Sequence, residues 1–291
     1  MRILVVGSNG FLGSQIVKQL RDEGHVLQGL NRGISPLNHG HFIGDIATPS
    51  SYQEALLRWQ PEVVIQTAWV TTKETYRSSN ANVGYAESTI SFAEACYRSD
   101  VQHFIGLGSS AEYGIPSKPC VAGVTATDPI DIYGSSKVFT SQKILEISKG
   151  YSKRFTWARV FQPYGPGQDL FRLIPSAIQS LLSQQTVFVK NPRAVLDWIT
   201  TRDVASAVAF LLSRDLPEFI DIASGVPCAT LSLVQELVDQ LGFDTKSILI
   251  PSKSIDEEVS PLFIGQDSPL LKSGWTPQDN IQSGVKWTLG L

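Results

Sequence analysis

Tyr133 and Lys137 are two proton-carrying side chains four residues apart, in a stretch over residues 131–150 whose apolar positions recur with helical spacing. On a helix this spacing puts both side chains on one face, about one turn apart. A Tyr and a Lys placed in this way are more often a solvated surface pair than a catalytic one. Two serines upstream favour the catalytic interpretation, because Ser109 and Ser110 follow a predicted strand at its carboxyl end, where open α/β sheets bind ligands.

Three glycines near the N-terminus have the spacing of a dinucleotide-binding turn. Residues 3–6 form a short apolar run typical of a buried parallel strand, and residues 11–20 have helical spacing. Gly7, Gly10 and Gly13 lie at the turn between them. Without a Cβ, these residues allow a tight turn, close approach of a pyrophosphate and close packing of helix on strand. The helix N-terminus would direct free N–H groups at the phosphate, so we expect dinucleotide binding here.

The end of the second predicted strand bears on which dinucleotide binds. This strand covers residues 26–30 and ends at Asn31-Arg32, with Asn31 lying 18 residues beyond Gly13. An NAD-binding unit places an acidic residue near this position, on the ribose 2′-hydroxyl, and that acid is absent here. The neutral Asn31 would not repel a 2′-phosphate, and Arg32 could pair with it. NADP(H) is therefore favoured and NAD(H) stays possible, although Arg32 could also be an ordinary solvated loop residue.

Strands and helices alternate regularly along the first half of the chain. The alternation predicts an α/β fold with a Rossmann-type, doubly wound parallel sheet and right-handed crossovers. Asp45 and Ala68-Trp69 follow two of its strands at their carboxyl ends, which is again the ligand side of such a sheet. The further strands are predicted at residues 41–43, 63–67, 103–107 and 155–160, and the helices from residue 48, over 82–98 and over 131–150.

The sequence changes in character after residue 162. A loop rich in Pro and Gly covers residues 162–168, and the alternation then becomes irregular. We therefore expect a dinucleotide-binding domain at 1–162 and a smaller substrate-binding lobe at 163–291, with residues 219–222 as a candidate strand that returns to the main sheet. Within the lobe, Ser232 is a plausible N-cap of a helix over residues 232–241.

Composition restricts the classes of function. The chain has 291 residues, of which 42% are apolar, and its net charge is −3 with no basic block. This is ample for a core and argues against a nucleic-acid partner or a membrane-surface role. Three cysteines without a Cys-x-x-Cys pair indicate reduced thiols, and the histidines are too dispersed for a metal site. We expect a soluble, cytoplasmic protein with a small-molecule substrate and neither a signal peptide nor a membrane span.

Three motifs together resemble the extended short-chain dehydrogenase/reductase superfamily, and the match extends over essentially the whole chain. The resemblance is to the NAD-dependent epimerase/dehydratase branch, which works on nucleotide-activated sugars, and within it to the nucleotide-sugar 4-ketoreductases. In chain order the motifs are Gly7-x-x-Gly10-x-x-Gly13, Ser109 followed by Tyr113-Gly114, and Tyr133-x-x-x-Lys137.

The resemblance implies a role for each motif residue. Tyr133 would be the general acid/base, and because a free tyrosine has a pKa near ~10, the Lys137 ammonium would be needed to favour its phenolate. Lys137 would also hold the nicotinamide ribose. Ser109 would hydrogen-bond the substrate oxygen, and Asn82 would support the site through its helix. The implied cofactor contacts are Gly7, Asn9, Gly10, Phe11, Leu12, Gly13, Asn31, Arg32, Asp45, Ile46, Thr67, Ala68, Trp69, Tyr133, Lys137 and Gln162.

One departure from the family pattern concerns dehydration. Sugar 4,6-dehydratases of the family carry acidic residues just after the position of Ser109, where this chain has Ser110 and Ala111. Glu112 comes one position later, and the sequence does not fix the face on which it lies. Water elimination is therefore disfavoured.

A second departure concerns the substrate pocket. The arginine that commonly binds the substrate diphosphate is Leu196 here, and Gln162 replaces the usual Asn. Arg193 or Arg172 could take the place of that arginine, although either could be an ordinary surface residue. Trp198 could provide a stacking surface. The expected substrate-binding residues are Ser109, Ser110, Gln162, Arg193 and Trp198.

These observations predict a NADP(H)-dependent oxidoreductase that reduces a keto group of a nucleotide-activated deoxysugar. The alternative is an NAD-dependent sugar-nucleotide epimerase that uses the same Ser109, Tyr133 and Lys137. A non-catalytic dinucleotide sensor is less favoured, because such proteins often lose the tyrosine or the lysine. The family further suggests a homodimer paired through the helices over residues 82–98 and 133–149, although their apolar faces could equally pack on the sheet.

Overall fold

The computed structural model describes residues 1–34, 40–70, 75–249 and 262–291. Its main sheet has seven strands in the order β10-β6-β5-β4-β1-β2-β3, and every neighbouring pair is parallel. This arrangement confirms the predicted Rossmann-type sheet. The strands are β1 (Arg2–Val6), β2 (Val26–Asn31), β3 (Gly40–Ile43), β4 (Val63–Gln66), β5 (His103–Ser109), β6 (Arg154–Val160) and β10 (Phe219–Ile222).

Alternate residues of β1 face opposite layers of helices. Ile3 and Val5 pack with α1 (Phe11–Asp22) and α6 (Thr201–Leu212). Leu4 and Val6 pack in the core on the other face, with α2 (Pro49–Leu57), α3 (Ala81–Arg98) and α4 (Ile132–Tyr151). Because both faces of the sheet are covered, the strand is apolar throughout rather than alternating.

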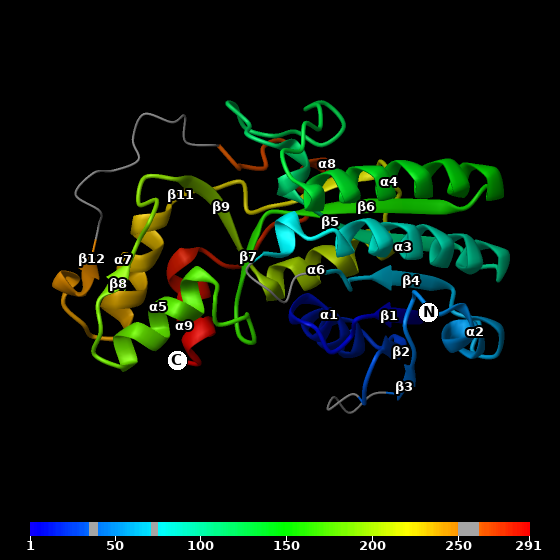
Figure 1. Ribbon diagram of the computed structural model, residues 1–291, viewed down its shortest axis with the longest axis horizontal. Helices are drawn as coiled ribbons and strands as arrows, with labels where there is room; N and C mark the ends of the chain where they lie inside the picture. The colour runs from blue at the N-terminus through cyan, green and yellow to red at the C-terminus, as the bar shows by residue number, and fades with distance from the viewer. Residues whose placement is uncertain (35–39, 71–74, 250–261) are drawn as a thin grey trace.

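The second lobe lies beside the main sheet, on the left in Figure 1. It contains a three-stranded sheet of β11 (Pro227–Ala229), β9 (Val195–Thr200) and β7 (Gln162–Tyr164). A two-stranded sheet of β12 (Ile248–Leu249) and β8 (Val187–Phe188) adds to it. The lobe has a core of its own, formed around α5 (Leu173–Leu182), α7 (Thr230–Gln240) and α9 (Ile281–Leu289).

Three segments beyond residue 162 pack with the main sheet or its helices. Residues 219–222 form β10, which pairs with β6, and α6 packs against α1. The short helix α8 (Pro269–Lys272) also returns there, since Leu270 lies in the same core as α6. The expected division at residues 162 and 163 stays a prediction.

The sequence did not indicate β7, β9 or β11, and one predicted helix cap is wrong. Helix α7 begins at Thr230 after an N-cap at Ala229, so Ser232 lies inside its first turn. The backbone N–H and the hydroxyl of Thr230 both donate to the Ala194 carbonyl, and this anchor sets the start of the helix.

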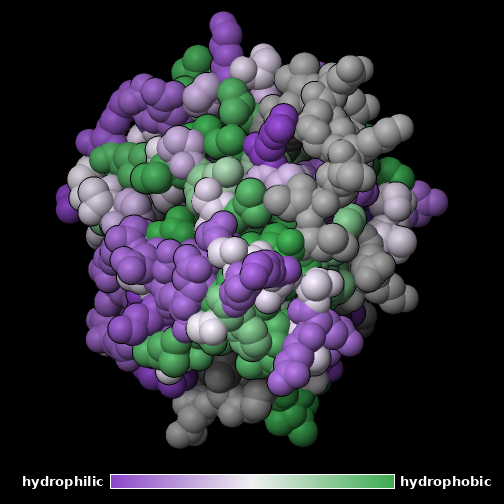
Figure 2. All heavy atoms as spheres, turned by 90° about the vertical axis from the view of Figure 1, so that its left-hand side faces the viewer, coloured by the Kyte–Doolittle hydropathy of each residue, from purple (hydrophilic) through white to green (hydrophobic). Residues whose placement is uncertain are grey.

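Figure 2 shows the face of the second lobe, where small groups of hydrophobic side chains lie between hydrophilic ones. Leu182 and Phe188 are among the exposed apolar residues of this lobe. Within the described ranges, no helix combines the length and the hydropathy needed to cross a bilayer. Cys96, Cys120 and Cys228 are free thiols.

Candidate active site

The glycine turn between β1 and α1 is packed too closely for side chains. Gly7 has a φ of +77°, and a Cβ there would lie 2.9 Å from Thr67 Oγ1. A Cβ on Gly13 would lie 2.1 Å from the Gly7 carbonyl oxygen, so this glycine lets α1 pack on the turn. Helix α1 has Gly10 as its N-cap and receives no side-chain cap there. The turn therefore fits the close approach of a pyrophosphate to a helix N-terminus.

A cleft of about 990 Å³ extends from this turn across the carboxyl ends of the strands to the second lobe. It brings together nearly all of the residues that the sequence assigned to a cofactor or a substrate. Whether they contact these ligands stays a prediction. Those that line the cleft are Gly7, Asn9, Gly10, Phe11, Leu12, Gly13, Asn31, Arg32, Asp45, Ile46, Thr67, Ala68, Trp69, Ser109, Ser110, Tyr133, Lys137, Gln162 and Trp198.

Two predicted site residues lie outside the cleft lining. Arg193 is exposed at the turn before β9, and its role as a substrate ligand stays a prediction. Asn82 is fully buried in α3 and accepts a hydrogen bond from Trp69 Nε1 at 2.8 Å. Its Nδ2 donates to the carbonyls of Tyr76 at 2.6 Å and Ser79 at 2.9 Å. Asn82 therefore holds Trp69 and Tyr76, two residues that line the cleft, and its role in catalysis stays a prediction.

Asn31 braces the glycine turn, a contact that the sequence did not indicate. Its Nδ2 donates to Ser8 Oγ at 2.7 Å, and its Oδ1 accepts from the Asn9 backbone N–H at 3.2 Å. Arg32 follows it on the cleft lining. Burial raises the pKa of Tyr85 to about 12, with Asp45 adding to the shift and Arg32 opposing it. Both charges therefore act at this end of the cleft.

The start of α4 places Tyr133 against the end of β5. Asp131 is the N-cap, and its Oδ1 accepts from the Gly134 N–H at 2.7 Å. A Cβ on Gly134 would lie 2.8 Å from the Ala111 carbonyl oxygen, so α4 packs closely on the 3-10 helix η2 (Ser110–Tyr113). Tyr133 and Lys137 are 8% and 4% exposed on the cleft wall. The spacing had predicted that they share a helix face, and both line the same cleft.

Burial is the main cause of the pKa shifts of Tyr133 and Lys137. It lowers the pKa of Lys137 to about 7, and the charge of Glu112 opposes that shift. The Lys137 ammonium donates to the Leu107 carbonyl at 2.6 Å and lies 3.9 Å from the centroid of the Trp69 ring. Burial likewise raises the pKa of Tyr133 well above its ordinary value, while a hydrogen bond with Ser109 acts in the opposite direction. A phenolate at this position therefore needs positive charge nearby.

The structure settles the direction of Glu112, which points away from the cleft. The carboxylate is fully buried and forms a capping box with Ser109, accepting from the Ser109 N–H at 2.9 Å. Its other contacts are Trp157 Nε1 at 2.9 Å and Arg159 Nε at 2.7 Å, both on β6. Glu112 is therefore bound to the end of β5 and to β6, beneath the site.

Sequence reasoning missed an aromatic and cationic group at the mouth of the cleft. Tyr76 and Arg77 belong to the 3-10 helix η1 (Tyr76–Ser78), for which no periodic pattern gives a signal. The Tyr76 ring lies 5.1 Å from the ring of Tyr133. Arg172, which the sequence offered as an alternative anion ligand, also lines the cleft and donates to the Tyr76 hydroxyl at 3.3 Å.

Comparison with known proteins assigns the family. The model of the NAD dependent epimerase/dehydratase family matches residues 3–223, which is most of the chain. The chain belongs to this family. It is therefore an enzyme of the extended short-chain dehydrogenase/reductase type, as the motifs had indicated.

Relatives in this family carry more than one activity. The chain is 23% identical to a UDP-glucose 4-epimerase of Lactobacillus helveticus, over 99% of this chain and 97% of that protein. It is also 23% identical to a GDP-6-deoxy-D-talose 4-dehydrogenase of Aggregatibacter actinomycetemcomitans, over 93% and 90% of the two chains. The solved structure of a UDP-glucose 4-epimerase from Thermus thermophilus in complex with NAD superposes with a TM-score of 0.85 at 20% identity, covering 100% and 98%. At this identity the last comparison supports the fold alone.

Proposed function

We propose that this enzyme is a NADP(H)-dependent ketoreductase that reduces a keto group of a nucleotide-activated deoxysugar. The observation that carries the proposal is the placement of Ser109, Tyr133 and Lys137 on one wall of the cleft that begins at the glycine turn. A bound nicotinamide dinucleotide would supply the hydride. Ser109 and Tyr133 would hold the carbonyl oxygen, and Tyr133 would protonate it as negative charge develops there. The dehydrogenase name of one relative describes the reverse of such a reduction.

The acidic residues of the site support reduction over dehydration. In the described part of the chain, the carboxylates that line the cleft are Asp45 and Asp169. Asp45 lies toward the glycine turn, since its charge acts on Tyr85 together with that of Arg32. Glu112, the acid that follows Ser109, is tied to Arg159 beneath the floor. Glu112 is therefore not available as a water-eliminating acid beside Ser109.

For the substrate diphosphate we propose Arg172 in place of the arginine that Leu196 replaces. Arg172 is the N-cap residue of α5, whose first turn receives no side-chain cap. Its guanidinium lies 4.8 Å from the Tyr76 ring centroid and 5.0 Å from that of Phe171. No carboxylate within the described ranges pairs with it. A guanidinium at a helix N-terminus suits a diphosphate, and Trp198 across the cleft would offer a stacking surface.

The proposed preference for NADP(H) rests on the charge of Arg32 and on position 31, where the chain has a neutral Asn instead of an acidic residue. Parallel calorimetric titrations of NADP(H) and NAD(H), with mass spectrometry of any dinucleotide that co-purifies, test this preference. Single-turnover assays of NADPH oxidation with 4-keto sugar nucleotides and small ketones then test the reaction. A preference for exchangeable NADPH that Arg32→Ala weakens supports the proposal, whereas no oxidation with any keto substrate counts against it.

The second candidate is a sugar-nucleotide epimerase that retains NAD. Relatives named UDP-glucose 4-epimerase and the printed description of the family favour it. In this case Tyr133 would remove the proton from one hydroxyl oxygen of the sugar as its carbon is oxidised, and would return a proton to that oxygen when the carbon is reduced again. Tightly held NAD, insensitive to Arg32→Ala, with interconversion of two hydroxyl epimers and no net use of cofactor, would identify this activity.

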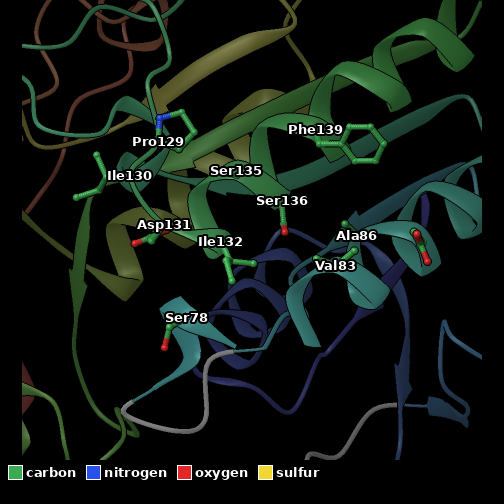
Figure 3. A pocket seen from close by; sticks show the side chains of 11 residues that line it. Ser78, Val83, Ala86, Pro129, Ile130, Asp131, Ile132, Ser135, Ser136 and Phe139 are labelled. Atoms are coloured by element: carbon green, nitrogen blue, oxygen red, sulfur yellow. The ribbon is translucent and has the colours of Figure 1, made fainter. Parts of the chain in front are cut away.

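We also propose that the enzyme is a cytoplasmic homodimer. A groove of about 760 Å³ lies between the starts of α3 and α4. Figure 3 shows the side chains that line it. Val83, Ile130 and Phe139 line it and are 50%, 66% and 48% exposed. A second copy of α3 and α4 would cover these apolar side chains. Light scattering on wild type and on Phe139→Glu tests this, with a dimer that the substitution dissociates as the expected result.

A further inference from the structure

Arg77 lies close to Tyr133. It is held there by Asp131, the N-cap residue of the helix that carries Tyr133. Its Nη1 donates to Asp131 Oδ2 at 2.8 Å, and its Cζ lies 6.0 Å from the centroid of the Tyr133 ring. The other carboxylate oxygen of Asp131 accepts from Gly134 at the first turn of α4. One carboxylate thus fixes both the start of the helix and the position of the guanidinium, which lines the cleft.

The charged and titratable groups around Tyr133 come from every element packed against it. Lys137 lies one turn along α4, with its ammonium 5.8 Å from the Tyr133 ring centroid. Tyr76 and Arg77 face it from η1, and Glu112 acts on it from η2. Ser109, at the end of β5, contributes a neutral hydroxyl. The negative charge of Glu112 is itself paired with Arg159.

The two cations beside Tyr133 respond differently to pH. Burial lowers the pKa of Lys137 to about 7, so this ammonium loses its charge near neutrality. A guanidinium stays protonated at every pH a protein tolerates. Burial by itself would lower the pKa of Arg77, but interactions with Tyr76 and Asp131 outweigh it and raise that pKa. Arg77 therefore remains charged where Lys137 does not.

We propose that Arg77 is a second positioning cation, beside Lys137, which acts through Tyr133 by stabilising its phenolate. The inference rests on the proposed function, in which Tyr133 is the proton donor. The substrate carbonyl carbon gains a hydride from the reduced dinucleotide, and its oxygen takes the Tyr133 proton, which leaves the tyrosine as a phenolate until solvent reprotonates it. Arg77 acts on that negative charge. Removing one positive charge at this distance should raise the pKa of Tyr133 by about one unit and lower the phenolate fraction roughly tenfold.

Nitration by tetranitromethane tests the proposal without any substrate, because the reagent attacks the phenolate and its rate follows the phenolate fraction at a fixed pH. Mass spectrometry of peptides gives the rate at Tyr133 relative to Tyr151, which is 37% exposed and serves as an internal reference. We expect Arg77→Gln to lower this ratio about tenfold. Arg77→Lys should restore most of it, since it keeps the charge.

A matched control is Arg58→Gln, which removes an exposed guanidinium that is paired with Glu54 and does not line the cleft. It should leave the ratio unchanged. The proposal is overturned if the nitration ratio of Tyr133 to Tyr151 is equal in wild type and Arg77→Gln, or if it is higher in Arg77→Gln. Failure to detect nitration of Tyr133 in either protein counts as an equal ratio. The proposed reductase activity is judged separately, by turnover of wild type against Tyr133→Phe, so the two ideas can fail independently.

Discussion

Arg159 donates its Nε to Glu112 Oε2 at 2.7 Å, directly behind the strand end that carries Ser109. Both side chains are nearly or fully buried. The other oxygen of Glu112 accepts from the Ser109 N–H and from Trp157 Nε1. The pair therefore fixes the backbone position from which Ser109 reaches into the cleft.

Breaking this buried pair should cost far more stability than breaking an exposed one. Arg159→Met leaves the Glu112 carboxylate buried without its cation, which should lower the free energy of unfolding by about 3–5 kcal/mol. Arg58→Met breaks the exposed pair with Glu54 and should cost less than about 1 kcal/mol. Urea denaturation of both variants measures the difference. Similar losses in the two would contradict the assignment of Glu112 and Arg159 as a buried pair that supports the site.

Removing the phenol hydroxyl should separate catalysis from cofactor binding. Tyr133→Phe keeps the ring packed against Tyr76 but removes the proton donor, so kcat should fall at least ~100-fold. The dissociation constant for the dinucleotide should change little, because the glycine turn is untouched. Steady-state kinetics and calorimetry give the two numbers. A variant that retains wild-type kcat would show that another group transfers the proton.

A single methyl group in the glycine turn should abolish dinucleotide binding. A Cβ at position 13 would meet the Gly7 carbonyl oxygen, so Gly13→Ala must push α1 away from the turn. Gly150→Ala is the matched control, since a Cβ near the end of α4 meets nothing within 4 Å. We expect calorimetry to detect no dinucleotide binding to the first variant and wild-type affinity in the second. Loss of binding in both would point to a general effect on folding.

The parts of the site that the sequence predicted are those that local patterns encode. The glycine turn follows from an apolar run, three glycines and a helical period that are adjacent in the chain, and Tyr133 and Lys137 follow from one helical spacing. The pairing of β7 with β9 joins Gln162 to Trp198 as register partners. The two residues lie far apart in the chain, and no short-range pattern indicates such a contact.

Asn31 and Arg77 illustrate the same limit at single positions. Asn31 lies on the cleft lining, and its predicted cofactor contact stays a prediction, but its amide is hydrogen-bonded to Ser8 and Asn9, which depends on how the turn folds back over β2. Arg77 follows no periodic pattern and gains its position from Asp131, 54 residues further along the chain. Long-range hydrogen bonds of this kind determine which polar side chains are positioned to face the cleft.

The stability of the enzyme should depend on pH through Asp221. Burial raises the pKa of this carboxyl to about 7, although the Tyr113 hydroxyl donates to it. A pKa above the unfolded value of ~3.9 means that the folded state favours the protonated acid, so this contribution to stability is complete below about pH 4 and is lost as the pH rises through about 7. Asp221→Asn removes the titration while keeping a neutral polar group of similar shape.

Urea denaturation of wild type and Asp221→Asn across this pH range isolates the contribution of Asp221, because every other titrating group is common to both proteins. We expect the variant to gain roughly 1–4 kcal/mol relative to wild type between about pH 4 and pH 8. The titration of Asp197 and Asp203, whose pKa values burial also raises, cancels in this difference. A difference that stays constant with pH would mean that Asp221 titrates alike in the folded and unfolded chain, and that Arg159 and Tyr113 offset its burial in full.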